Sequence, residues 1–313
     1  MRSRAGWLVP WLLVAAVGQV AAVELVRRVF VETIRGQLVE TAALDGNSIG
    51  RSHIEGLVDS VLSAMTVVSL AVATIAIGFI ALIRGRFRLA AATTLLIAGA
   101  NLTTQLLKEL IERPDLGVDL ARAAAGNSLP SGHTTVAASV VVALVLVLPA
   151  QLRGVAALAG AGYAALAGVA TLSAGWHRPS DAVAALLIVG AWAALAGLVL
   201  VVASRREHTD PARPHTFTVL VLVLAALVLL AGAVLAMLVT DRSIGTAGEL
   251  VGRGRLLVAY AGGAAGIAGT ASLVMALVLA TVHLVVPERG RVSRSGRLAA
   301  AAAGRPAASA RAR

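Results

Sequence analysis

Eight long apolar stretches are the feature that most limits what this chain can fold into. Each holds about 20 mostly apolar residues, the length that an α-helix needs to cross the hydrocarbon core of a bilayer. Lipid permits only helices and closed barrels, and the alternating pattern of a barrel strand is absent. The sequence therefore predicts an all-α fold, a polytopic membrane helical bundle, with spans at about 6–26, 60–83, 88–108, 133–150, 153–174, 181–203, 216–240 and 256–286.

The composition supports a membrane protein and excludes several kinds of site. Hydrophobic residues make up 58% of the chain and charged residues only 14%, values outside the usual range of soluble domains. There are no cysteines, so disulfides, thiolate catalysis and cysteine-ligated metals are excluded. The net charge of +11 does not indicate nucleic acid binding, because the arginines flank the apolar stretches instead of forming a basic face.

The distribution of positive charge predicts how the bundle is oriented. With the N-terminus in the cytoplasm, the cytoplasmic loops and tails hold most of the 27 lysines and arginines. We therefore expect a multi-pass protein of the cell membrane with both termini in the cytoplasm. The first apolar stretch, which follows two arginines, also resembles a cleavable signal peptide, but its length favours a retained anchor helix.

The same patterns divide the chain into four parts. Residues 1–59 form an N-terminal anchor helix and an outer loop, and residues 60–203 form the core that carries the polar motifs. Residues 204–286 add two transmembrane helices, and the Arg/Ala-rich segment 287–313 is expected to be a disordered cytoplasmic tail. In the outer loop, residues 27–59 alternate acids and bases, which fits either a helix lying along the outer surface or a solvated connector.

Polar residues gather at the predicted outer ends of three of these helices. Lys108 ends the third stretch, the tetrapeptide Pro-Ser-Gly-His at 130–133 opens the fourth, and His177 and Asp181 open the sixth. The orientation was derived from a charge count that used no histidine. That the histidine motifs fall on one side of the membrane is therefore independent support for this orientation. The three motifs are therefore expected to meet at the outer face.

These residue types suit phosphoryl transfer. Lys108 and Arg113 supply cations, and the arginine can hold a phosphate in a bidentate fork. The Ser131 hydroxyl and the amides that follow it begin a helix, where free N–H groups and the dipole favour an anion. Gly132 allows the backbone to approach that anion closely. The chemistry also needs a nucleophile and an acid, which two histidines can provide, one of them oriented by a carboxylate.

Taken in order, these motifs resemble the three signature motifs of the type 2 phosphatidic acid phosphatase family. Its superfamily also contains the vanadium haloperoxidases. The resemblance covers about residues 60–203 and implies a six-helix phosphatase core without metal or cofactor. It implies that His177 attacks phosphorus to form a phosphohistidine, that Asp181 orients His177, and that His133 protonates the leaving alkoxide. The residues implied to hold the phosphoryl oxygens are Lys108, Arg113, Ser131 and Gly132.

Two positions depart from the family pattern. The first motif has two residues fewer than usual between its lysine and Arg113, and Asp115 stands where the arginine is expected. Thr171 occupies the place of an arginine that begins the third motif, so one phosphate-binding cation is missing. We expect Arg178 or Arg122 to supply that charge from another direction.

The resemblance implies hydrolysis of a lipid phosphomonoester or diphosphate at the extracytoplasmic face. Phosphatidic acid, phosphatidylglycerophosphate and isoprenoid phosphates are the substrate types that it implies, and the lipid substrate and the bilayer are the expected partners. One alternative is a catalytically impaired lipid-binding or transport protein of the same fold, which the threonine at 171 favours. Another is a vanadate-dependent haloperoxidase, which eight spans and a lipid-level site disfavour.

Overall fold

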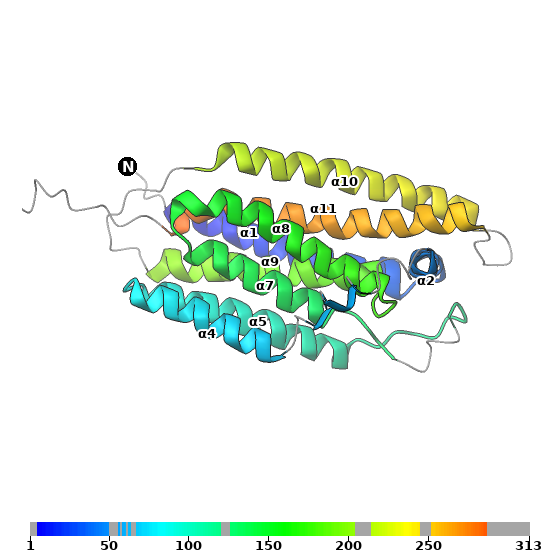
Figure 1. Cartoon of the computed structure of the whole chain (residues 1–313), viewed down its shortest axis with the longest axis horizontal. Coiled ribbons are helices and arrows are strands. Elements are labelled where there is room, and N and C mark those ends of the chain that lie inside the picture. Colours follow the sequence, from blue (N-terminus) through cyan, green and yellow to red (C-terminus); the bar gives the residue numbers. More distant parts are fainter. Residues whose placement is uncertain are drawn as a thin grey trace, which may run out of the picture.

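The protein is a bundle of long helices with one short helix lying across its end (Figure 1). The computed structural model describes residues 5–49, 56, 58–60, 62–63, 67–119, 126–203, 214–244 and 252–286. Within these ranges the chain is helical and contains no strand. The elements are α1 (Ala5–Val26), η1 (Arg27–Val31), α2 (Ile34–Asp45), η2 (Gly46–Ser48), α4 (Val67–Ile83), α5 (Phe87–Leu110), α7 (Gly132–Val147), α8 (Ala150–Ser173), α9 (Pro179–Ala203), α10 (Thr216–Ser243) and α11 (Arg253–Val285).

Each of the eight predicted apolar stretches overlaps one helix of the structure, so the predicted polytopic helical bundle is confirmed. Six helices are long and apolar enough to cross a membrane, and α4 and α7 contribute shorter apolar segments. The chain is thus a multi-pass membrane protein. The predicted tail, residues 287–313, lies outside the described residues.

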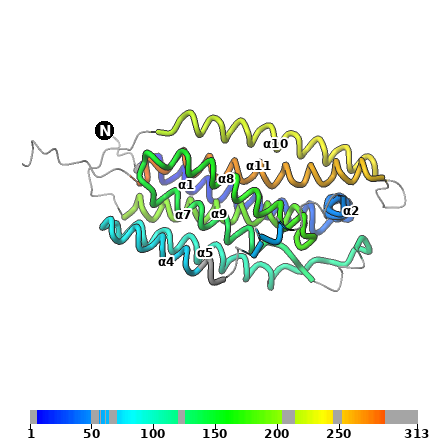
Figure 2. Tube along the Cα trace, viewed as in Figure 1, coloured from blue at the N-terminus to red at the C-terminus, as the bar shows by residue number. Residues whose placement is uncertain are grey.

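Helix α9 lies at the centre of the bundle and positions most of the others. It packs against α1, α5, α7, α8 and α11, and it is the most buried of the six long spans. Helix α10 is the least buried of the six and packs mainly against α11, beside which it runs in Figure 2. Helices α4 and α5 lie on the opposite side of the bundle from this pair (Figure 1).

Small residues allow the central helices to approach closely. A side-chain carbon added at Gly99 of α5 would lie 2.6 Å from the ring of Trp192 on α9, so only glycine fits there. The Trp192 indole also donates a hydrogen bond of 3.0 Å to Thr103 Oγ1 of α5. Close packing and interhelical hydrogen bonds are the main attractions between helices in lipid, where apolar burial alone gives little.

Of the two alternatives for residues 27–59, the structure contains a helix within that segment. Thr33 caps α2, its hydroxyl oxygen accepting a hydrogen bond from Gly36 N–H. The helix is seen nearly end-on in Figure 1, because it crosses the end of the bundle instead of running along it. It packs against α9, α10 and α11, and Gln37, Glu40 and Leu44 are buried. It is therefore an integral part of this end of the bundle, which we call the α2 end.

Candidate active site

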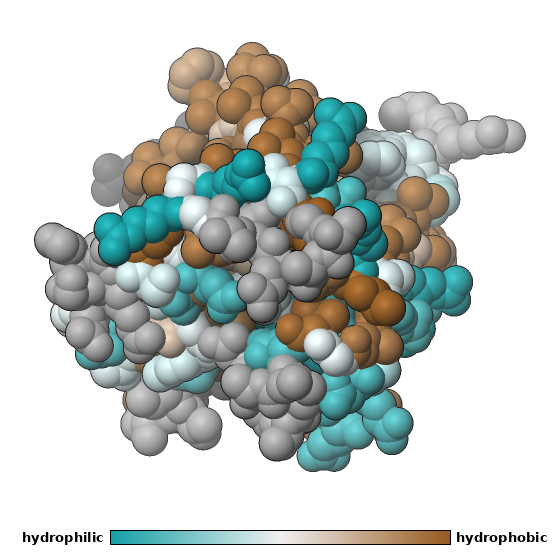
Figure 3. Space-filling view, turned by 90° about the vertical axis from the view of Figure 1, so that its right-hand side faces the viewer, coloured by the Kyte–Doolittle hydropathy of each residue, from teal (hydrophilic) through white to brown (hydrophobic). Residues whose placement is uncertain are grey.

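The predicted motif residues that the structure describes come together at the α2 end. Helix α5 brings Lys108 there, α7 begins there at Gly132, and the turn between α8 and α9 carries His177. The backbone N–H of Ser131 donates a hydrogen bond of 2.9 Å to the carbonyl oxygen of Asp181, which joins two of the motifs directly. Hydrophilic side chains gather on this end, and hydrophobic ones lie along parts of its sides (Figure 3).

The turn that carries His177 is held by the end of α8. The backbone N–H groups of Trp176 and His177 both donate to the carbonyl oxygen of Thr171, at 3.0 and 3.2 Å. Gly175 has a φ of +75°, a left-handed conformation that glycine adopts without strain. The chain then enters α9 at Pro179, a residue whose fixed φ suits the first turn of a helix. Asp181 follows in that first turn.

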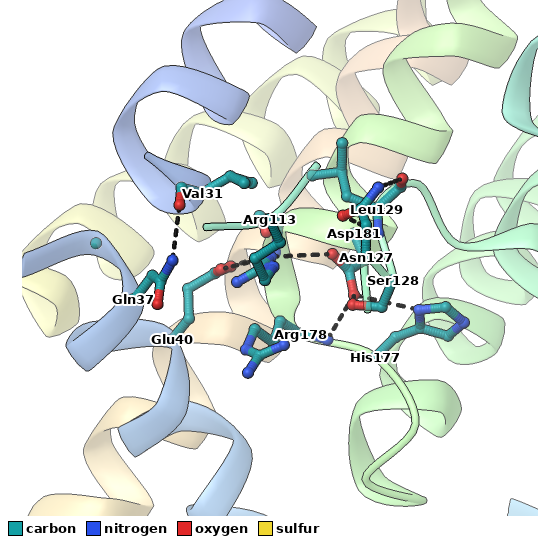
Figure 4. A network of polar contacts seen from close by, with 12 residues as sticks. Val31, Gln37, Glu40, Arg113, Asn127, Ser128, Leu129, His177, Arg178 and Asp181 are labelled. Atoms are coloured by element: carbon teal, nitrogen blue, oxygen red, sulfur yellow. Dashed lines mark hydrogen bonds and ion pairs between the residues drawn. The ribbon is translucent and has the colours of Figure 1, made fainter. Parts of the chain in front are cut away.

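His177 and Asp181 form a hydrogen-bonded dyad (Figure 4). His177 Nδ1 lies 3.2 Å from Asp181 Oδ2, and the Asp181 side chain is fully buried. The same oxygen accepts hydrogen bonds from Ser128 Oγ at 2.6 Å and from the backbone N–H of Arg178 at 3.0 Å. Three partners on one oxygen fix the carboxylate, and the carboxylate fixes the imidazole. The arrangement leaves His177 Nε2 to react with a substrate.

Arg113 lies between two carboxylates, as Figure 4 shows. Its Nη2 is 3.7 Å from Asp181 Oδ1 and 3.7 Å from Glu40 Oε2, and its side chain is buried. None of its three guanidinium nitrogens has a hydrogen-bond partner within the described ranges. The structure thus places this residue, predicted to hold phosphate, against the carboxylate of the dyad.

Glu40 is a member of this network that the motif analysis missed. Its Oε1 accepts a hydrogen bond of 2.8 Å from the backbone N–H of Ser180, at the start of α9. Burial and the nearby Asp181 carboxylate raise the pKa of Glu40 to about 7, although Arg113 opposes the rise. One sequence signal was present: Glu40 shares a helical stripe with the apolar Ala43 and Leu44, and an acid on such a stripe usually has a buried partner.

Gln37 ties the same helix to the loop that carries Arg113. Its side-chain Nε2 donates hydrogen bonds to the carbonyl oxygens of Pro114 at 3.1 Å and Val31 at 2.8 Å. Helix α2 is therefore joined to the site by Gln37 and by Glu40, one turn apart.

Lys108, Gly132 and His133 form the other side of the site. A side-chain carbon added at Gly132 would lie 3.7 Å from Lys108 Nζ, so the ammonium group sits directly over this glycine. The His133 ring lies 5.3 Å from the ring of Trp176, measured between centroids, and is within electrostatic reach of His177 and Lys108. The two histidines and the lysine thus surround one region beside the N-terminus of α7.

Ser131 is the N-cap residue of α7. Its Oγ accepts hydrogen bonds from Thr134 N–H at 3.4 Å and from the Thr134 hydroxyl at 3.0 Å. A hydroxyl has two acceptor positions and one hydrogen to donate. Both acceptor positions are used within the first turn of α7.

Thr171, which stands where the family has an arginine, is fully buried. Its hydroxyl donates to the carbonyl oxygen of Gly168, so this side chain takes no part in the site. Arg178 and Arg122 are the two candidates to replace the missing charge. The guanidinium of Arg178 pairs with Asp119 at 3.0 Å, and burial together with Arg113 lowers the pKa of Arg178. Arg122 lies outside the described residues.

Comparisons with known proteins give one result. Residues 64–200 match the sequence family described as the PAP2 superfamily. This range includes α4 to α8, most of α9 and all three motifs, whereas α1, α2, α10 and α11 fall outside it. No curated protein and no solved structure gives a significant match. Among the described residues, no cluster of three or more His, Cys, Asp or Glu side chains is placed to hold a metal ion.

Proposed function

Because residues 64–200 of this membrane protein belong to the PAP2 superfamily, a family of phosphatases, we propose that it hydrolyses a phosphomonoester or diphosphate of a membrane lipid. The observation that carries the proposal is the buried His177–Asp181 dyad beside the N-terminus of α7, with Lys108 over Gly132. This arrangement combines an oriented nucleophile with a cationic site for an anion. Both are needed for phosphoryl transfer.

The reaction proceeds in two steps. His177 Nε2 forms a bond to phosphorus while the bond from phosphorus to the leaving oxygen breaks, and His133 gives that oxygen a proton. Asp181 accepts the hydrogen bond from Nδ1 and stabilises the positive charge that develops on the ring. Water then forms a bond to phosphorus while the bond from phosphorus to His177 Nε2 breaks, and the water gives up a proton to His133. Inorganic phosphate leaves, and both histidines return to their starting states.

The phosphoryl oxygens are held by groups from two helices. Lys108 Nζ supplies a positive charge, and the Ser131 hydroxyl supplies a hydrogen. The backbone N–H groups of Gly132 and His133 lie in the first turn of α7, where they have no partner within the helix. Arg113 faces Asp181 through Nη2, so we assign it first to stabilising the ionised carboxylate.

The placement of the site favours a lipid substrate. The motif residues lie at the ends of apolar helices, so a bound phosphate would sit at the level of the lipid headgroups while its hydrocarbon part stays in the bilayer. The excess of positive charge on the opposite side supports a cell-membrane protein with cytoplasmic termini and an extracytoplasmic site. The substrate types of the family, phosphatidic acid, phosphatidylglycerophosphate and isoprenoid phosphates, all fit this placement.

A phosphate-release assay with the purified chain tests the proposal. The substrates are a panel of lipid phosphates, and the key variant is His177→Ala. We expect His177→Ala to lower the turnover number by about 1,000-fold or more, as removal of a nucleophile usually does. His215→Ala, at the opposite end of the bundle, removes a histidine outside the site and should leave turnover unchanged.

Each other outcome points to a different function. No release from any lipid by the unsubstituted protein would refute the enzyme and favour the binding or transport protein that Thr171 suggests. Halide oxidation that requires added vanadate would indicate a haloperoxidase. Equal loss of activity in both histidine variants would show that the loss comes from general destabilisation.

A further inference from the structure

A second cavity lies next to the site but contains none of its predicted catalytic residues. Its volume is about 290 Å³, and helices α1, α2, α9, α10 and α11 together with η1 surround it. Most of its lining is apolar, including Phe30, Val183, Leu230 and Met237. It meets the site at Glu40, which lines the cavity and also faces Arg113. Of its walls, only α9 lies within the range that matches the PAP2 superfamily.

Three buried polar side chains line this cavity without complete hydrogen bonding. Ser180 is 3% exposed and Thr240 is 2% exposed, and neither hydroxyl oxygen has a hydrogen-bond partner among the described residues. The same holds for Glu40 Oε2, whose nearest charged neighbour is Arg113 at 3.7 Å. Burying polar atoms without partners is costly. Their presence in an apolar cavity indicates a ligand that carries a polar group of its own.

The polar atoms lie at one end of an elongated space. Ser180 starts α9 and Thr240 is near the end of α10, both at the α2 end. The lining continues along α10 to Leu230, which at 1.5 Å per residue is ~15 Å deeper into the bundle. A space of this length can hold an extended hydrocarbon chain alongside α10 and α11.

We propose that this cavity binds a single-chain lipid alcohol, with its hydroxyl group at Ser180, Thr240 and Glu40 and its chain between α10 and α11. A hydroxyl both donates and accepts hydrogen bonds, so it can pair with a serine or threonine hydroxyl and with a carboxylate. A phosphate head would meet the Glu40 carboxylate, and an amine would compete with Arg113 for it. Because most of the surface of α10 is exposed, a chain can reach the cavity from the surrounding lipid. Binding at this site does not depend on the proposed phosphatase activity.

Photolabelling of the purified full chain tests where such a ligand binds. The probe is dodecan-1-ol with a photoreactive diazirine near the end of its chain. We expect labelled peptides from residues 230–240 and 259–270, and competition by unlabelled dodecan-1-ol. Labels restricted to the lipid-facing side of α4 and α5 would overturn the proposal. This mapping uses the unsubstituted protein, so it stands even if a variant fails to fold.

A matched pair of glycine variants tests whether the cavity itself is occupied. Gly266→Leu fills the cavity, because a side-chain carbon at this position meets only Ala233 Cβ, at 3.6 Å. Gly232→Leu makes the same change at an exposed position on α10 where a side-chain carbon has no neighbour within 4 Å. We expect labelling to fall about tenfold in Gly266→Leu and to stay unchanged in Gly232→Leu. Equal labelling of the two variants would refute the site.

Competition by dodecane, which has no polar head group, and by dodecyl phosphate tests whether the cavity recognises the hydroxyl group of the ligand. Dodecan-1-ol should compete about tenfold better than dodecane in the unsubstituted protein, and the double variant Ser180→Ala with Thr240→Val should remove that difference. If dodecane competes equally well from the start, the cavity recognises only the chain. If dodecyl phosphate competes better than the alcohol, the cavity belongs to the substrate. Either result overturns the assignment of a lipid alcohol.

Discussion

Replacing Glu40 by glutamine tests the buried carboxylate that joins α2 to the dyad. Glutamine keeps the size of the side chain and the acceptor for Ser180 N–H, but it cannot ionise. The pKa of Glu40 rises from 4.5 to about 7 in the folded protein. At 1.36 kcal/mol per pKa unit this corresponds to about 3 kcal/mol, and because the side chain is 2% exposed, little of it is screened by solvent.

The sign of the effect follows from where the proton binds more tightly. Because the folded state has the higher pKa, the stability linked to this proton is fully present below pH 4.5 and is lost as the pH rises through about 7. The unsubstituted protein should therefore lose about 3 kcal/mol more than Glu40→Gln between pH 5 and pH 8. At about 2 °C per kcal/mol for a chain of this size, its melting temperature should fall by about 6 °C more.

Thermal unfolding in one detergent at both pH values, followed by tryptophan fluorescence, measures this difference. All six histidines are present in both proteins, so their titration cancels in the comparison. Glu109→Gln, at an exposed position near the end of α5, controls for the loss of one carboxylate and should follow the unsubstituted protein. Parallel pH dependence of Glu40→Gln and the unsubstituted protein would refute the linkage. An opposite sign would show that the charge of Arg113 outweighs burial and keeps Glu40 ionised.

Two further substitutions test single contacts. Ser128→Ala removes the 2.6 Å hydrogen bond to Asp181 Oδ2. Phosphate release should fall about 10-fold to 100-fold, mainly through a lower kcat. An unchanged kcat would show that the other partners suffice to hold this carboxylate. Gly99→Ala puts a methyl group 2.6 Å from the Trp192 ring and should cost about 1–3 kcal/mol, lowering the melting temperature. Gly78→Ala meets nothing within 4 Å and is its control; equal melting temperatures would mean that the two helices separate easily.

The sequence was sufficient for the helices because lipid leaves few alternatives to an apolar stretch of spanning length. It was also sufficient to bring His177 next to Asp181, since residues four apart share one face across a helix N-terminus. The direction of the Arg113 side chain was not predictable, because the motif fixes that an arginine is present but not which anion it faces. Glu40 was missed for a related reason: its partners are Arg113 and Ser180, far along the chain.

The position of α2 means that the segment matching the PAP2 superfamily is shorter than the segment that builds the site. The segment that matches the PAP2 superfamily begins at residue 64, after α2 has ended, yet Glu40 reaches Arg113 from that earlier segment. A chimera cut at the family boundary would keep every motif and still remove the counter-charge behind the dyad. A shortened or grafted version of this protein should therefore start before Thr33, the residue that caps α2.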